Sequence, residues 1–357
     1  MKIPEPRKLS SGKWFVQLRI DGQSVSISEA DKDLCVAKAM AIKTGLIKAK
    51  LAPKNITIGE AIDDYIAARN NILSPSTIRA YKSYRQNRFK TIMEKQINNV
   101  TEAQLQRAIN QELESSCAPS GKNGSNYKQS PVSSKTVINA YGLIRTVLSL
   151  ETDLNFDRII VPKKPVMIGK TLTPEQIGTL LRSVKGDMIE IEVLLAVWLG
   201  LRRSEIAALN KVDFDFGKET ASVHSALVLD ENNQWVEKGT KTALSTRTLP
   251  CPAYILELIA PLPDGRISRL NPNTYNKRLK EICKANGLPE IRFHDLRHCA
   301  ASVMLILGIP DKYAMERGGW ASKQTMTGRY QHTVGKIAQS YGEIIDKYYY
   351  SLMDSKG

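Results

Sequence analysis

Cysteine and histidine are scarce in this sequence, and long apolar runs are missing from it. The five cysteines are scattered and include no CxxC pair, which argues against a disulfide framework and indicates reduced thiols. The most apolar runs, at 193–201 and 303–309, are far shorter than the roughly 20 residues that cross a membrane. The first residues, MKIPEPRKLSSGKW, lack the apolar segment of a signal peptide. We therefore expect a soluble, cytoplasmic protein with no membrane partner.

Acidic residues are also in short supply: 36 Asp and Glu face 51 Lys and Arg, which gives a formal net charge of +15. Such a surplus favours a polyanionic partner, with DNA or RNA as the leading candidates. A basic protein without such a partner is the alternative, and charge alone does not separate the two. The length of 357 residues predicts two or three compact units.

Residues 1–54 form the first predicted domain, a small β-sheet packed on one helix. Residues 14–20 show the alternation of a strand, Asp21-Gly22 is a hairpin-turn signal, and a helix is expected over 33–50. The basic residues around these elements favour an accessory DNA-binding module. The alternative is a hairpin that only packs on the next domain.

Residues 55–160 are predicted to form a helical domain. Capping boxes at 57–60 and 101–104 indicate two helix starts. Between them, basic side chains recur every three residues, with tyrosines interleaved; they are Arg79, Lys82, Arg85 and Arg88. We interpret them as a stripe that follows DNA phosphates. A solvated helix face is the alternative.

A linker is predicted at 161–170, where prolines and lysines separate the helical domain from a third domain at 171–357. We expect two of these lysines, Lys163 and Lys164, to contact DNA as well. The third domain begins with another capping box and mixes helices with short strand-like segments near 213–250. The predicted fold class is therefore α+β and mainly helical.

Half of the four histidines lie in the stretch RFHDLRHC, with Arg297 between them. His294 and His298 are four residues apart, so a helix would place them on one face, where two zinc ligands could sit. The intervening residues are not those of a zincin motif, and Arg297 would repel a dication. An anion site is favoured, because an arginine fork binds two phosphate oxygens and a histidine can donate or accept a proton.

Further candidate side chains lie before and after this stretch. The segment GLRRSE places Arg202 in a turn after an apolar helix, where Glu205 could orient it. The remaining candidates, in chain order, are Lys241 with Lys238 as its competitor, Trp320 and Tyr330. Each residue alone is a weak signal, because short motifs recur by chance.

In this order and spacing, the candidates resemble the signature of the tyrosine recombinases, the phage integrase family. The matching residues are Arg202-Arg-Ser-Glu205, Lys241, His294-Asp-Leu-Arg297, Gly319-Trp320 and Tyr330. The resemblance covers roughly 171–350 and implies a mixed α/β catalytic domain of the DNA breaking–rejoining type. More loosely, residues 56–160 resemble the family's core-site-binding domain, and the N-terminal segment resembles its arm-site-binding domain.

The resemblance also implies a role for each residue. Tyr330 would attack a DNA phosphodiester to give a 3′-phosphotyrosine and a free 5′-hydroxyl, and because the bond energy is kept, rejoining needs no ATP. Arg202 and Arg297 would hold the non-bridging oxygens in the transition state. Lys241 would protonate the leaving 5′-oxygen, and His294 would assist the tyrosine. No metal and no other cofactor is implied.

Trp320 stands where the family often has histidine. Its indole N–H can donate to a phosphate oxygen, but it cannot carry a proton. His298 and His332 are interpreted as structural histidines. The tyrosines of this domain that compete with Tyr330 are Tyr313, Tyr341 and those at 348–350. Tyr330 is preferred for its distance from the Gly-Trp pair.

For the whole chain, the resemblance implies a site-specific recombinase that works as a homo-tetramer on two DNA duplexes, through a Holliday junction. It would integrate and excise a phage or other mobile element in a bacterial host cell. An excisionase and a host DNA-bending protein are expected as further partners. Two alternatives remain open: a chromosome-dimer resolvase of the same family, against which the N-terminal module argues, and a DNA-binding protein with the same fold and no catalysis.

Overall fold

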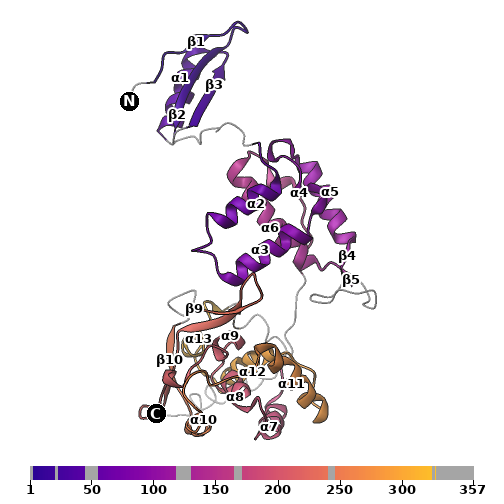
Figure 1. Cartoon of the computed structure of the whole chain (residues 1–357), viewed down its shortest axis with the longest axis vertical. Helices are drawn as coiled ribbons and strands as arrows, with labels where there is room; N and C mark the ends of the chain where they lie inside the picture. The colour runs from indigo at the N-terminus through magenta and orange to yellow at the C-terminus, as the bar shows by residue number, and fades with distance from the viewer. Residues whose placement is uncertain are drawn as a thin grey trace, which may run out of the picture. The chain divides into compact units, whose positions relative to one another are not determined.

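The computed structural model in Figure 1 describes residues 3–20, 23–44, 55–117, 130–164, 171–239, 246–323 and 326. The chain is a mixed α/β protein in which helices outweigh small sheets, so the predicted fold class is confirmed. It divides into two compact units, Met1–Leu73 with Ala80–Pro165 and Ser74–Arg79 with Val166–Gly357. The three domains drawn from the sequence, with the linker at 161–170, stay a prediction.

Three antiparallel strands and one helix make up the N-terminal part of the first unit. They are β1 (Arg7–Lys8), β2 (Trp14–Ile20), β3 (Gln23–Glu29) and α1 (Lys32–Lys43). Val16 pairs with Ile27 and Leu18 with Val25 in the β2–β3 register. These four side chains are buried in one core with residues of α1, which lies along the sheet (Figure 1). The alternation in the sequence therefore predicted the buried face of this sheet, while the turn at 21–22 lies outside the described residues.

Residues 55–164 are mostly helical in the parts that the structure describes. Their elements are α2 (Ile58–Ala67), α3 (Pro75–Asn87), α4 (Lys90–Met93), η1 (Ile97–Asn99), α5 (Glu102–Glu114), β4 (Ser116–Cys117), β5 (Ser130–Pro131), α6 (Ser134–Glu151) and η2 (Phe156–Arg158). Thr57 and Glu60 form a capping box before α2, and Thr101 and Gln104 form another before α5. Each box bonds backbone N–H groups that a helix start leaves without partners, so both helices begin where the sequence predicted.

The second unit combines helices with two small antiparallel sheets, ordered β10-β7-β6 and β8-β9. Its helical elements are α7 (Pro174–Ser183), α8 (Glu190–Trp198), α9 (Arg203–Ile206), η3 (Lys211–Asp213), α10 (Ala253–Ile259), α11 (Pro272–Ala285), α12 (Phe293–Ile306) and α13 (Asp311–Gly318). Its strands are β6 (Phe214–Asp215), β7 (Thr220–Val223), β8 (Ser225–Leu229), β9 (Trp235–Gly239) and β10 (Arg247–Pro250). The apolar helix α8 packs against α12, and side chains from both join one large core.

Two glycines end the helices that lead into the candidate site. Gly200 follows the end of α8 with a φ of 69°, and Gly319 caps α13 with a φ of 64°. This left-handed conformation suits glycine, which has no Cβ to clash with the backbone. At Gly319 space is short as well, because a Cβ there would lie 2.9 Å from Nη1 of Arg247. The two turns thus bring bare backbone close to the arginines of the site.

Four of the five cysteines fit the expectation of reduced thiols. Cys35, Cys251, Cys283 and Cys299 are free and buried. Burial raises the pKa of the Cys251 and Cys299 thiols to about 11, so both stay protonated near neutral pH. Among the helices that the structure describes, none is long and apolar enough to cross a membrane.

Candidate active site

Arg202 and Glu205 meet at the start of α9. The Glu205 carboxylate accepts the backbone N–H of Arg202 at 2.9 Å and forms an ion pair with the Arg202 guanidinium. On the other side, Nη2 of Arg202 donates to the carbonyl oxygen of Gly319 at 2.7 Å. The Glu205 side chain is 3% exposed, while that of Arg202 is 33% exposed. Glu205 therefore orients Arg202 from behind and leaves part of the arginine accessible.

Arg297 enters the same region from α12. Its side chain is buried, with 1% of the residue exposed, and Nη1 donates to the carbonyl oxygens of Gly200 and Gly318. Its Cζ lies 4.1 Å from the centroid of the Trp320 ring, which is a cation–π contact. The fold thus gathers Arg297, Trp320 and Arg202 around the end of α13.

His294 lies in the first turn of α12, where it is exposed. The helix begins with a capping contact, because the Asp295 carboxylate accepts the backbone N–H of Arg292 at 2.8 Å. One turn further on, His298 is buried, and the two imidazole rings meet edge to face with centroids 5.1 Å apart. Within the described ranges, no group of three or more His, Cys, Asp or Glu side chains is placed to hold a metal ion. His294 is accessible to a substrate, whereas His298 packs inside the unit.

Two catalytic candidates, Lys241 and Tyr330, lie outside the described residues. Lys241 follows Gly239, the last residue of β9, by two positions, and Tyr330 follows the buried Met326 by four. Lys238, the competitor of Lys241, is half-buried on β9. Also outside the described residues are His332, Tyr341 and the tyrosines at 348–350. Their assigned roles stay predictions.

Arg247, the first residue of β10, belongs to the arginine cluster although sequence reasoning assigned it no role. Its side chain is 5% exposed, and Nη2 donates to the Glu205 carboxylate at 3.1 Å. Its Nε donates to the carbonyl oxygen of Arg317 at 2.9 Å. The sequence does contain a signal: Arg247 alternates with Leu249 on a short strand, so both side chains face the interior. An arginine on the apolar face of a strand requires a buried acceptor.

Positive charge exceeds negative charge in this cluster, where Arg202 and Arg247 bind Glu205 and Arg297 binds the adjoining carbonyls. Burial by itself raises the pKa of Glu205, but the charges of Arg247 and Arg202 outweigh burial and hold that pKa below its usual value. Glu205 is therefore ionised at neutral pH. Guanidinium groups fixed in this way are suited to an anion with several oxygens, such as a phosphate diester.

The residues predicted to contact DNA fall into two groups. Four are exposed, namely Arg79, Lys82, Lys163 and Lys164. The other two lie in ion pairs: Arg85 is 3.3 Å from Asp63 and 3.7 Å from Glu94, and Arg88 is 3.3 Å from Glu112. A step of three residues falls about 60° short of a full helical turn, so side chains at this spacing wind around α3. DNA contact stays a prediction for all of them.

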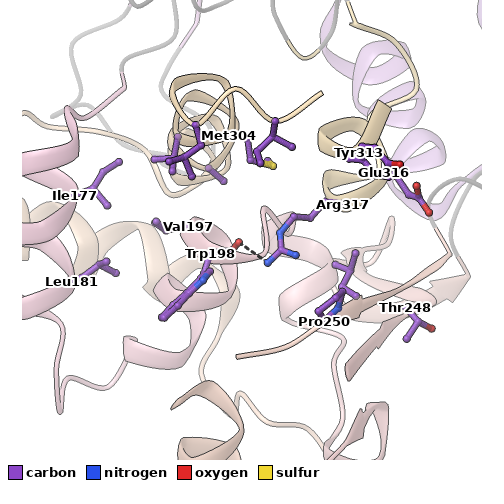
Figure 2. A pocket seen from close by; sticks show the side chains of 15 residues that line it. Ile177, Leu181, Val197, Trp198, Thr248, Pro250, Met304, Tyr313, Glu316 and Arg317 are labelled. Atoms are coloured by element: carbon purple, nitrogen blue, oxygen red, sulfur yellow. Dashed lines mark hydrogen bonds between the residues drawn. The ribbon is translucent and has the colours of Figure 1, made fainter. Parts of the chain in front are cut away.

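Beside the arginine cluster lies a cavity of about 710 Å³ with mostly apolar walls from α7, α8, β10, α12 and α13. Figure 2 shows Arg317 among these side chains, with its Nη2 donating to the Trp198 carbonyl oxygen at 3.3 Å. Burial lowers the pKa of Arg317. Tyr313, one of the competing tyrosines, also lines the cavity and is 63% exposed. Since the Arg317 carbonyl binds Arg247, the cavity and the cluster share the end of α13.

Comparison with known proteins shows that this chain is similar to integrases and tyrosine recombinases. Residues 170–335 match the model of the phage integrase family. The XerC-like tyrosine recombinase of Caldanaerobacter subterraneus is 23% identical over 249 residues, which cover 57% of this chain and 64% of that protein. The integrase of Salmonella phage P22 is 24% identical over 276 residues, which cover 70% of each chain.

A solved structure shows the shared fold. The Tn1549 transposon integrase in complex with transposon right end DNA superposes with a TM-score of 0.59, at 18% identity, over 82% of this chain and 100% of that chain. The chain spans less than two thirds of the length of several curated relatives that it matches, the XerC-like recombinase among them.

Proposed function

We propose that this chain, whose residues 170–335 match the model of the phage integrase family, is a site-specific DNA recombinase that integrates and excises a phage or other mobile element. The observation that carries the proposal is the cluster of Arg202, Arg297 and Trp320. Arg202 and the Gly319 carbonyl that it binds are 117 positions apart in the chain. The fold brings these distant residues to one place, as a shared phosphate site requires.

In the proposed reaction, the Tyr330 oxygen attacks the phosphorus and the bond to the 5′-oxygen breaks. Lys241 gives a proton to that leaving oxygen, and His294 assists the tyrosine. The negative charge that develops on the non-bridging oxygens is stabilised by Arg202 and Arg297. Attack of a 5′-hydroxyl from the other duplex on the phosphotyrosine then releases Tyr330 and restores a phosphodiester.

The two arginines differ in how they meet the phosphate. Arg202 offers an accessible edge, because a third of its side chain is exposed. Arg297 is buried and donates to the carbonyl oxygens of Gly200 and Gly318. Arg297 would therefore contribute its charge from inside the unit, while Arg202 meets the phosphate at the surface.

The N-terminal sheet offers a polar surface for the predicted arm site. Its outer face carries Gln17, Arg19, Ser24, Ser26 and Ser28, all exposed. A β-ribbon of this size enters a major groove, where hydroxyl, amide and guanidinium groups bind base edges and phosphates. The helical part and the lysines at 163–164 would hold the core site.

Strand exchange between two duplexes requires four cleavages, and each protomer supplies a single Tyr330. This stoichiometry supports a homo-tetramer that passes through a Holliday junction. An excisionase and a host DNA-bending protein would set the direction of the reaction by bending the DNA between arm and core sites. The chromosome-dimer resolvase and the DNA-binding protein without catalysis remain the alternatives.

A recombination assay tests the proposal. Two copies of the sequence that flanks the gene are placed on one plasmid, and the purified chain is added in EDTA. We expect recombinant junctions that are absent with Arg202→Ala. DNA binding without junctions would favour the protein without catalysis, and junctions from directly repeated sites alone would favour a resolvase.

A further inference from the structure

Three successive carbonyls at the end of α13, those of residues 317–319, each bind a different arginine. Arg247 donates to the first at 2.9 Å, and Arg297 donates to the second. Arg202 donates to the third at 2.7 Å. The last carbonyls of a helix lack partners within the helix and carry partial negative charge, so the three guanidinium groups stabilise this helix end. Two of these arginines are assigned to the phosphate, and Arg247 is not.

Arg247 contacts both parts of the structure that hold Arg202, namely the Glu205 carboxylate and the end of α13. Its Nη2 donates to the Glu205 carboxylate at 3.1 Å, and the same carboxylate holds the Arg202 guanidinium. Its Nε holds the carbonyl two positions before Gly319, the residue whose carbonyl binds Arg202. With a side chain only 5% exposed, Arg247 lies behind these groups, out of reach of a DNA phosphate.

We propose that Arg247 is a positioning residue for DNA strand cleavage: without touching the phosphate, it holds Glu205 and the end of α13 where they set the guanidinium groups of Arg202 and Arg297. This inference rests on the proposed recombinase function. The precise setting of such groups matters because a displacement of about 1 Å in an active site can lower a rate on the order of 10²-fold.

Arg247 also controls the charge of Glu205. The charged groups that act on this carboxylate, among the described residues, are Arg247 from β10 and Arg202 from the start of α9; Arg297 of α12 binds the adjoining carbonyls. In the Arg247→Gln variant, Arg202 alone remains to offset the effect of burial, so the pKa of Glu205 rises. A protonated Glu205 no longer pairs with Arg202. Cleavage by this variant is therefore lost as the pH falls through the raised pKa, at a pH where the unaltered chain keeps its rate.

The test measures covalent adduct on nicked suicide DNA from the flanks of the gene, as a rate from pH 5 to pH 8. The variants are Arg247→Gln and Arg247→Lys. The matched control is Arg278→Gln, which removes an arginine of the same unit that binds Asp187 at 2.7 Å. We expect Arg247→Gln to cleave on the order of 10²-fold more slowly, with nearly unchanged DNA affinity. In its pH–rate profile, the fall in rate at acid pH should move to higher pH. Arg247→Lys should also cleave slowly, but its rate should fall at nearly the same acid pH as that of the unaltered chain.

The outcomes separate the inference from the function on which it rests. If the unaltered chain gives no adduct, the recombinase function fails. If it gives adduct and Arg247→Gln matches the control in rate and pH profile, the positioning role is overturned. Should Arg247→Gln not fold, Arg247→Lys decides, because a rate equal to that of the control would overturn the role and a slower rate at equal DNA affinity would support it.

Discussion

At the scale of single residues, the site depends on one buried carboxylate. Glu205 is 3% exposed and binds the guanidinium groups of both Arg202 and Arg247, together with a backbone N–H. Burying a charge is costly unless it is paired and hydrogen-bonded. Glu205 is paired with two guanidinium groups and one backbone N–H, so it stabilises the fold and orients Arg202, the arginine proposed to meet the phosphate.

Replacement of Glu205 by glutamine tests this double role. The Glu205→Gln change leaves the buried guanidinium of Arg247 without its counter-ion, and we expect a loss of about 3 kcal/mol in the free energy of unfolding. Glu281→Gln is the matched control, because Glu281 is 48% exposed and pairs with Arg278 at 3.1 Å; an exposed pair contributes less than about 1 kcal/mol. Urea titration gives both values, and equal losses would contradict the importance of the buried pair.

At the scale of elements, the end of α13 and the start of α12 hold Gly318, Trp320 and Arg297 in contact. Gly318 is the last residue of α13, and Trp320 lies so close to it that a Cβ on Gly318 would be 1.9 Å from the indole ring. The indole in turn stacks on Arg297. Because Gly318 has no side chain, the Trp320 ring can lie where it contacts the Arg297 guanidinium.

Gly318→Ala is expected to displace the Trp320 ring and, with it, Arg297. We expect a loss of about 1–3 kcal/mol in the free energy of unfolding, as for an overfilled core, and a drop in cleavage rate on the order of 10²-fold. Gly178→Ala in α7 is the control, because its new methyl group meets only one arginine nitrogen, at 3.4 Å. Thermal unfolding and the covalent-adduct rate measure the two effects. A Gly318→Ala protein as active as the control would show that the ring position is unimportant.

The elements also show what the sequence can and cannot predict. Helix starts such as the Thr57–Glu60 capping box and the buried face of β2 depend on neighbours within a few residues, and both agree with the structure. Arg247 was missed because its acceptor, Glu205, lies 42 positions away. The ion pairs of Arg85 and Arg88 could not be predicted for the same reason: Arg88, for example, meets Glu112 only in the folded chain. Signals that depend on near neighbours can be recognised in a sequence. Pairings between residues far apart in the chain can be recognised only in the folded structure.

At the scale of the whole molecule, the net charge of +15 is the property that bears on DNA affinity. Binding that releases many counter-ions weakens steeply with salt, and we expect affinity to fall ~10³-fold between about 50 and 200 mM salt. Arg79→Ala and Lys82→Ala should each lower the slope of log affinity against log salt by about one. The main effect of Arg85→Ala should be the loss of the ion pairs that Arg85 forms with Asp63 and Glu94. Fluorescence anisotropy at several salt concentrations measures the slopes, and a shallow slope for the unaltered chain would refute the phosphate contacts.

The most direct test of the account is covalent trapping on nicked suicide DNA in EDTA. Purified protein and a Tyr330→Phe variant are each incubated with DNA from the flanks of the gene, and the products are separated on a denaturing gel. We expect a protein–DNA adduct with the unaltered chain and none with the variant. An adduct that persists in Tyr330→Phe would contradict the assigned nucleophile, and tight binding with no adduct from either protein would contradict catalysis by this chain.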